Sequence, residues 1–206
     1  KGLMIADLVA VRSEDEAVFA ARHGFVPARM QQLAGDQREV FVMLNEERRI
    51  GVNLPPNRAE VLLSLVTCMF LHGGIAHILG NMWFFWIFGN NIEDRLGHLL
   101  FLVFYLVGGV AATFCHALVE PGSQVPVIGA GGAVAAVLGG YAVTYPLARV
   151  RCLIFFYFIT VIELPAIAVL GLWFAGQLAS VMAQLGEQSI GGGIAFFAHI
   201  GGFVFG

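Results

Sequence analysis

Three apolar stretches of this 206-residue chain contain isolated polar or unusually small residues that could do chemistry. His77 and Asn81 stand four residues apart in HILGN, so a helix would place both on one face. His199 lies in AHIGGFVFG, and the stretch GAGGA puts a glycine at position 131. Because polar side chains inside a membrane are costly, such residues are by default candidates for function.

Together these residues supply most of the parts of a nucleophilic active site. Such a site needs a nucleophile beside a base, and hydrogen-bond donors aimed at the developing oxyanion. His199 can act as the base, while His77 and Asn81 can act as the donors. The nucleophile is missing, because Gly131 has no side chain. The alternative for His77 and Asn81 is that they hydrogen-bond neighbouring helices.

The composition indicates that any such site is built within a membrane. Hydrophobic residues make up 58% of the chain and charged residues only 12%, about half the charged share of a soluble domain. We therefore expect an integral membrane protein in contact with the lipid bilayer. The net charge of −3 and the lack of a basic stripe give no indication of nucleic acid binding.

Other intramembrane chemistries fit the sequence less well. The HExxH pair of a zinc protease is absent, and the aspartates form no pair within apolar segments. A haem protein would explain neither the spacing of Asn81 nor the glycine turn. We expect no metal and no other cofactor. The three cysteines are odd in number and lie in or beside apolar runs, so we expect buried thiols rather than disulfides.

The apolar runs predict an all-α membrane protein with six transmembrane helices in a single domain over residues 1–206. The runs cover residues 2–11, 73–89, 98–119, 129–148, 166–183 and 191 onward. The first and last are shorter than the roughly 20 residues of a span, so we expect both to be truncated. Residues 12–60 predict a long, structured interfacial first loop. A surface helix over 61–71 and an interfacial piece before Pro165 complete the expected elements.

The arginines of the short loops predict the orientation of these helices. Arg95 lies in one loop, and Arg149 and Arg151 lie in another, whereas the alternate loops carry no lysine or arginine. The positive-inside rule then places the arginine-bearing loops in the cytoplasm and the long first loop outside. We expect a multi-pass protein of a bacterial-type plasma membrane.

Small residues at a spacing of four predict which helices touch. Such ladders allow helix backbones to approach closely. One ladder is Gly132, Ala136 and Gly140, and the other is Ala198, Gly202 and Gly206. We therefore expect the helix over 129–148 to pack against the last helix, with residue 131 beside His199.

The stretches FLHGGIAHILGNMWFFWIFG, EDRLG, GAGGA and AHIGGFVFG, in this order, resemble the rhomboid intramembrane serine proteases. In that family the glycine turn reads GxSG, and its serine attacks the peptide bond. The resemblance places Gly131 at the serine position, His199 at the general base, and His77 and Asn81 in the oxyanion hole. It also implies a structural arginine at Arg95, beneath the first loop. The remaining structural positions that we expect are Gly129, Gly132 and Gly202.

This resemblance implies a serine endopeptidase that cuts single-pass transmembrane proteins near the outer membrane face with a Ser–His dyad. The chain as written is expected to be inactive, because Gly131 replaces the serine, and Gly131→Ser is expected to restore activity. The alternative is a non-proteolytic pseudoprotease that binds transmembrane helices. Gly131 can reflect either natural loss or deliberate removal of the nucleophile.

Overall fold

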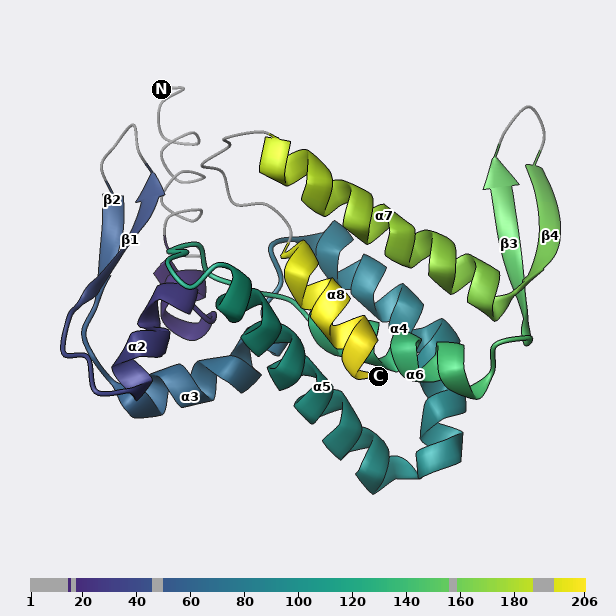
Figure 1. The fold of residues 1–206 in the computed structure, drawn as a ribbon, viewed down its shortest axis with the longest axis horizontal. Coiled ribbons are helices and arrows are strands. Elements are labelled where there is room, and N and C mark those ends of the chain that lie inside the picture. Colours follow the sequence, from purple (N-terminus) through teal and green to yellow (C-terminus); the bar gives the residue numbers. More distant parts are fainter. Residues whose placement is uncertain (1–14, 16–17, 46–49, 156–158, 187–194) are drawn as a thin grey trace, which may run out of the picture.

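The computed structural model describes residues 15, 18–45, 50–155, 159–186 and 195–206 (Figure 1). The expected first helix over residues 2–11 lies outside the described residues. The expected start of the last helix, at residue 191, lies outside them as well.

The segment before the first long helix is compact and mixed in structure. Its elements are η1 (Pro27–Arg29), α2 (Met30–Leu33), β1 (Val40–Asn45), β2 (Ile50–Leu54), α3 (Arg58–Thr67) and η2 (Cys68–Phe70). Strands β1 and β2 pair antiparallel, with Val42 opposite Val52. Asn57 caps α3, because its side chain accepts hydrogen bonds from the backbone N–H groups of Ala59 and Glu60. The described part of the long first loop is therefore ordered, and its interfacial position stays a prediction.

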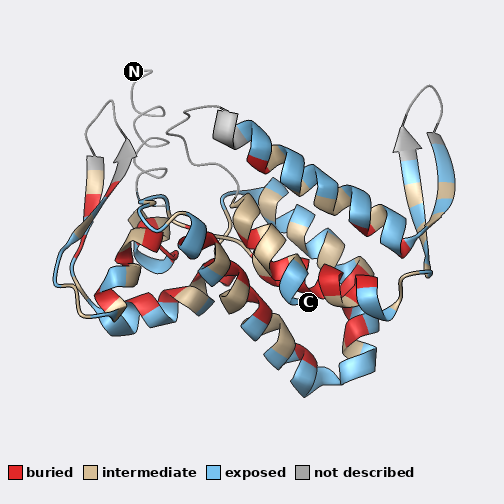
Figure 2. Cartoon of the chain, in the orientation of Figure 1, coloured by how far each residue is buried: buried red, intermediate tan, exposed pale blue. Residues whose placement is uncertain are grey.

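In the described part of the chain, five helices and one hairpin form the rest of the fold. The helices are α4 (Ile75–Leu96), α5 (His98–Val119), α6 (Gly131–Thr144), α7 (Ala166–Gly186) and α8 (Phe196–Phe205). Helix α6 lies at the centre, in contact with α4, α5, α7 and α8. Ten of its fourteen residues are buried, whereas the outer faces of α4 and α7 are exposed (Figure 2). A helix that is apolar on every side is buried on every side, which explains the central place of α6.

Helices α6 and α8 pack backbone against backbone, so the predicted contact between them is confirmed. A Cβ built on Gly202 would overlap the carbonyl oxygen of Gly132, and one built on Gly139 would overlap that of Phe203. The prediction paired Gly132 with the last helix, but the nearest neighbour of this glycine lies on α5. A Cβ built on Gly132 would lie 2.6 Å from the Cβ of Ala112. The glycine at 132 therefore serves two interfaces.

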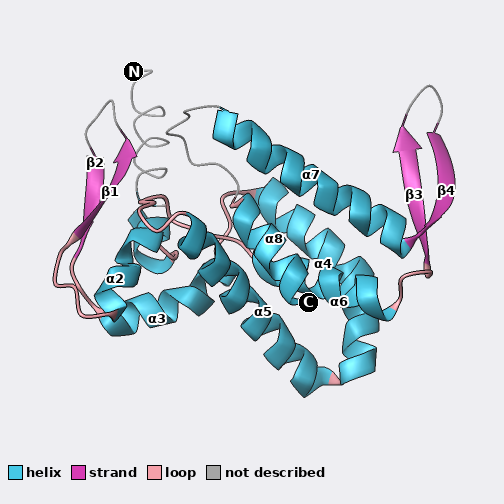
Figure 3. Ribbon diagram, viewed as in Figure 1, coloured by secondary structure: helices cyan, strands magenta, loops and turns pink. Residues whose placement is uncertain are grey.

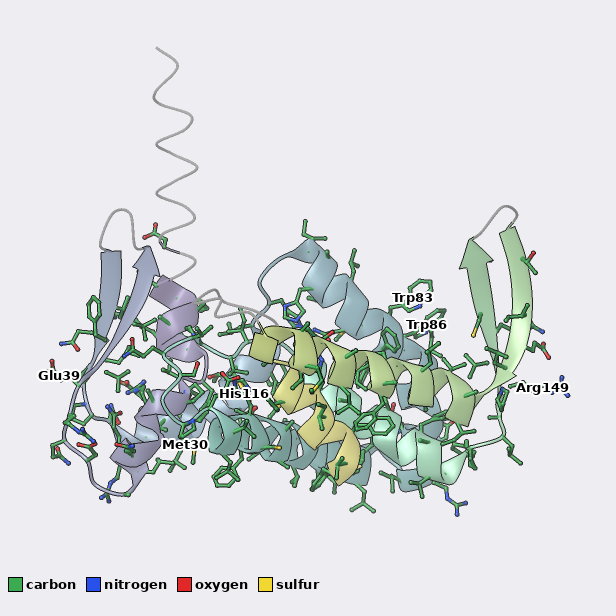
Figure 4. The ribbon with its side chains drawn as sticks, turned by 45° about the horizontal axis from the view of Figure 1, so that its top comes forward. Met30, Glu39, Trp83, Trp86, His116 and Arg149 are labelled. Atoms are coloured by element: carbon green, nitrogen blue, oxygen red, sulfur yellow. The ribbon has the colours of Figure 1, made fainter. Side chains whose placement is uncertain are left out.

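The described residues are mostly helical, as expected, but they also include two antiparallel hairpins, which the expectation of an all-α protein left out (Figure 3). The second is formed by β3 (Arg149–Phe155) and β4 (Ile159–Pro165), and it replaces the expected interfacial piece. β-branched and aromatic residues are frequent in this segment, and they favour strands. Arg151 lies opposite Glu163 in the register, and its Nε is 3.4 Å from the carboxylate. The hairpin projects away from the helices, with Arg149 at its base (Figure 4).

Two helices of the described residues, α5 and α7, are long and apolar enough to cross a membrane. The segment formed by α3 and η2 meets α4 at a bend of 81°. If this bent pair is counted as one span, the number of candidate spans rises to three. Helices α6 and α8 are apolar but shorter. The count of six spans therefore stays a prediction. The outer face of α4 is apolar and exposes Trp83 and Trp86, which project from the fold (Figure 4).

Candidate active site

The glycine turn leads directly into the central helix. Gly131 is the first residue of α6, and Ala130 precedes it as the N-cap. Gly129 has a φ of 117°, a backbone conformation that glycine adopts without strain. A Cβ at Gly129 would also lie 2.7 Å from Nε2 of His77. The turn therefore needs a glycine at 129 for two separate reasons. The N–H of Gly129 also donates a hydrogen bond to the carbonyl of Cys68, at 2.8 Å.

His199 lies beside Gly131 because α8 packs so closely on α6. A Cβ built on Gly131 would overlap Nε2 of His199, and it would lie 3.0 Å from Cδ2 of the same ring. The structure therefore brings the expected base to the expected nucleophile position. The imidazole itself occupies the space in which a side chain at position 131 would begin.

His77 and Asn81 face the turn from the first two turns of α4. From a Cβ built on Gly129, the distance to Nδ2 of Asn81 is 3.7 Å. Nδ1 of His77 accepts a hydrogen bond from the N–H of Gly73 at 3.3 Å, which leaves the proton of a neutral ring on Nε2, facing the turn. Nδ2 of Asn81 is buried and has no hydrogen-bond partner in the described part of the chain. Both side chains can therefore donate to a group bound at this turn.

Two further side chains contact the site, and the sequence analysis missed both. Nε2 of His72 lies 3.5 Å from the N–H of Ala130, and its ring packs edge-on against His77. Oε1 of Gln177 on α7 lies 2.7 Å from Nδ1 of His199. The signal for Gln177 was present, because it is a polar residue inside an apolar helix, as Asn81 is.

Arg95 does not lie beneath the first loop, so this expectation is wrong. It is exposed in the last turn of α4, at the opposite end of that helix from His77. There its charge suits the negative end of the helix dipole. Among the described residues of the first loop, the buried arginine is Arg29, whose Nη2 donates to the carbonyl of Pro55 at 3.1 Å and to Glu60 at 3.2 Å. Sequence reasoning missed Arg29, because one arginine among several exposed ones carries no local signal.

This arrangement can bind and polarise a carbonyl group but lacks a group to attack it. The donors of His77 and Asn81, together with the N-terminal end of α6, favour a developing negative charge. His199 can accept a proton. Nowhere in the described ranges do three histidine, cysteine or acidic side chains lie close enough to share a metal ion.

Comparison with known proteins gives the family of this chain. The model of the rhomboid domain matches residues 59–206, which include all the site residues described above. The chain belongs to the rhomboid family. It is therefore an integral membrane protein, as the rhomboid domain and the apolar helices indicate.

The rhomboid chain is similar to several eukaryotic relatives. It is 30% identical over 149 residues to presenilin-associated rhomboid-like protein A, mitochondrial, of Danio rerio, covering 70% of this chain and 36% of that protein. The human presenilin-associated rhomboid-like protein, mitochondrial, is 30% identical over 154 residues, 72% of this chain and 37% of the relative. RHOMBOID-like protein 1 of Arabidopsis thaliana is 27% identical over 123 residues, 60% of this chain and 30% of the relative.

The part of each relative that this chain matches is about a third of that relative's length. The names of these relatives are mitochondrial or their organisms are eukaryotic, so they lend no support to the expected bacterial-type plasma membrane.

Proposed function

We propose that this chain is a rhomboid-type intramembrane serine peptidase, built to cleave single-pass transmembrane proteins near the outer membrane face with a Ser–His dyad, and that it is inactive as written because Gly131 replaces the serine. One observation carries the proposal. Nε2 of His199 lies where a side chain of residue 131 would begin, while His77 and Asn81 face the same turn. This arrangement supports a Ser–His dyad with its oxyanion donors, from which the hydroxyl is missing.

The missing hydroxyl decides the expected rate. Covalent cleavage requires a nucleophile to form a bond to the scissile carbonyl carbon while the base takes its proton. Without the nucleophile, binding and oxyanion donors leave only a residual acceleration. Loss of a serine nucleophile lowers kcat by about 10⁶-fold in a well-studied serine protease. We expect the chain as written to be inactive on this scale.

The experiment that tests this proposal is Gly131→Ser in purified, detergent-solubilised protein. The substrates are single-pass transmembrane segments with a helix-destabilising residue near the outer membrane face, because a peptide bond must leave its helix before it can be attacked. We expect the variant to cut them, with the hydroxyl proton passing to Nε2 of His199 and the oxyanion received by His77 and Asn81. The imidazole must turn aside slightly to admit the new side chain.

The matched controls isolate the dyad. Gly131→Ala adds the Cβ without a hydroxyl, and Gly131→Ser combined with His199→Ala removes the base. Both are expected to be inactive. Cleavage by the Gly131→Ala variant would contradict the proposed chemistry, because no hydroxyl would be present to attack.

A non-proteolytic binding protein is the second candidate, and the position of the His199 ring favours it. The imidazole fills the space that a serine would need, as expected if the site no longer has to hold a nucleophile. A folded Gly131→Ser variant that is inert against several substrates, while the original chain still binds them in vesicles, would establish this candidate. Failure of the original chain to bind any transmembrane segment would overturn both.

The orientation in the membrane follows the same proposal. The ends of α4 and α6 that carry the site lie at the same side as the first loop, and we place this side away from the cytoplasm. Arg95 lies in the last turn of α4, and Arg149 and Arg151 follow α6, so all three lie at the other side. A bacterial-type plasma membrane stays a prediction, to be tested by locating the tagged protein in its source cell.

A further inference from the structure

Gln177 on α7 makes a direct hydrogen-bond contact with the base of the candidate site. Its Oε1 lies 2.7 Å from Nδ1 of His199, although the two residues stand 22 positions apart and on different helices. Nδ1 is the ring nitrogen that faces away from Gly131, whereas Nε2 faces it. The imidazole therefore lies between a carboxamide on one side and the nucleophile position on the other.

An acceptor at Nδ1 decides which nitrogen carries the proton. A neutral imidazole has one N–H and one lone pair, and a hydrogen bond to one nitrogen fixes the state of the other. With Oε1 of Gln177 as the acceptor, the proton stays on Nδ1. The lone pair of Nε2 then points at residue 131, as a general base requires.

We propose that Gln177 is the positioning residue of His199, which it holds in the Nδ1–H tautomer with Nε2 directed at position 131. The role of Gln177 in catalysis rests on the proposed function, because His199 acts as a base only when residue 131 supplies a hydroxyl. The tautomer of His199, in contrast, can be measured in the chain with Gly131, whether or not that chain cleaves anything.

Aromatic packing around the ring cannot do the same. Trp173, one turn before Gln177 on α7, lies with its ring centroid 6.1 Å from that of His199. Phe196 meets the ring at an interplanar angle of 88° and 6.3 Å. These rings restrict where the imidazole lies, but Phe196 has no hydrogen-bonding group and the indole of Trp173 is only a donor. Neither can accept the Nδ1 proton.

The first test uses the chain with Gly131, so it does not depend on protease activity. Ring-nitrogen chemical shifts of ¹⁵N-histidine-labelled protein in detergent report the tautomer, and the His199 signals are assigned by their loss in His199→Ala. We expect the Nδ1–H form in the original chain. Gln177→Met, similar in shape but with only the weak acceptor of a thioether, is expected to lose this preference, and Gln177→Glu is expected to keep it.

Control variants separate positioning from packing. Trp173→Leu removes ring packing but leaves Gln177 in place, and we expect the tautomer to remain Nδ1–H. Unchanged signals from His72 and His77 show that a variant is folded. An Nε2–H form in the original chain, or an unchanged Nδ1–H form in folded Gln177→Met, would overturn the proposal.

The second test adds the reaction. In the Gly131→Ser background we expect Gln177→Met to lower kcat by ~10- to 100-fold with KM nearly unchanged, because the base is misdirected while substrate binding is retained. Gln177→Glu is expected to restore most of kcat. An equal kcat in Gln177→Met would overturn the role of Gln177. If Gly131→Ser itself is inert, the proposed function fails, and the tautomer measurement still decides the inference.

Discussion

The carbonyl oxygen of Gly132 on α6 lies where a Cβ on Gly202 of α8 would stand. The two helices can approach this closely only because residue 202 has no side chain. Since Gly131 and His199 lie at the same end of this interface, the approach also sets the distance between base and nucleophile position. Packing and chemistry are therefore linked at one contact.

Replacing this glycine should separate the two helices. We expect Gly202→Ala to lower the free energy of unfolding in detergent by about 1–3 kcal/mol, because the added methyl meets backbone that cannot move aside. Gly80→Ala on α4 is the matched control, since a Cβ there meets no atom of the described residues within 4 Å. The control should be neutral or stabilising by about 0.5–1 kcal/mol. Equal unfolding temperatures for Gly202→Ala and the original chain would contradict this packing.

A methyl group at position 131 should act through the hydrogen bond of His199. From the sequence, Gly131→Ala is expected to be mild, because the turn would normally hold a serine. The structure shows that the new Cβ overlaps Nε2 of His199, so the ring must turn aside slightly, and its hydrogen bond to Gln177 should weaken. We expect a cost of about 1 kcal/mol in the free energy of unfolding.

A double-mutant cycle tests this cause. If Gly131→Ala acts by weakening the hydrogen bond between Gln177 and His199, its effect should shrink in the background of Gln177→Met. Thermal unfolding of the four proteins in one detergent gives the coupling. Strictly additive effects would show that the alanine acts elsewhere.

The buried Arg29 should hold the first loop together. Its side chain is 2% exposed, and it donates to Gln32, Pro55 and Glu60. We expect Arg29→Ala to destabilise the loop by about 1–3 kcal/mol, because the buried side-chain oxygen of Gln32 loses its donor. The half-exposed Glu60 should contribute little of this, since water screens its charge. Limited proteolysis should cut the loop faster in Arg29→Ala, whereas exposed Arg22→Ala should leave the rate unchanged.

The turn between α2 and β1 should show a pH dependence set by Asp36. The side chain and the backbone N–H of Arg38 hydrogen-bond its carboxylate, at 2.8 and 2.9 Å, and hold the pKa of Asp36 below its ordinary value. Because the folded pKa is lowered, this stabilisation is present above the unfolded pKa of about 4 and is lost as the pH falls through the folded pKa. Carboxyl NMR titration should show a low midpoint for Asp36. Arg38→Ala should raise that midpoint, and an unchanged midpoint would rule out the pairing.

The sequence was sufficient for the features that depend on local pattern. The helix over residues 98–119 matches α5 at both ends, and the helix expected from residue 166 begins there in α7. Long apolar runs between polar or proline-containing loops leave few alternatives in a membrane. The motif residues His77, Asn81, Gly131 and His199 could be selected because polar or missing side chains stand out in apolar sequence.

The tertiary structure decided everything that depends on two distant segments meeting. The contact between Gln177 and His199, the burial of Arg29 and the approach of Gly132 to Ala112 on α5 each join different elements. The hairpin over 149–165 also escaped prediction, because a short apolar run fits a buried helix as well as a strand. A spacing in the sequence fixes which side chains share a face. Only the packing of that face against another helix fixes which atoms of the two come within hydrogen-bond distance.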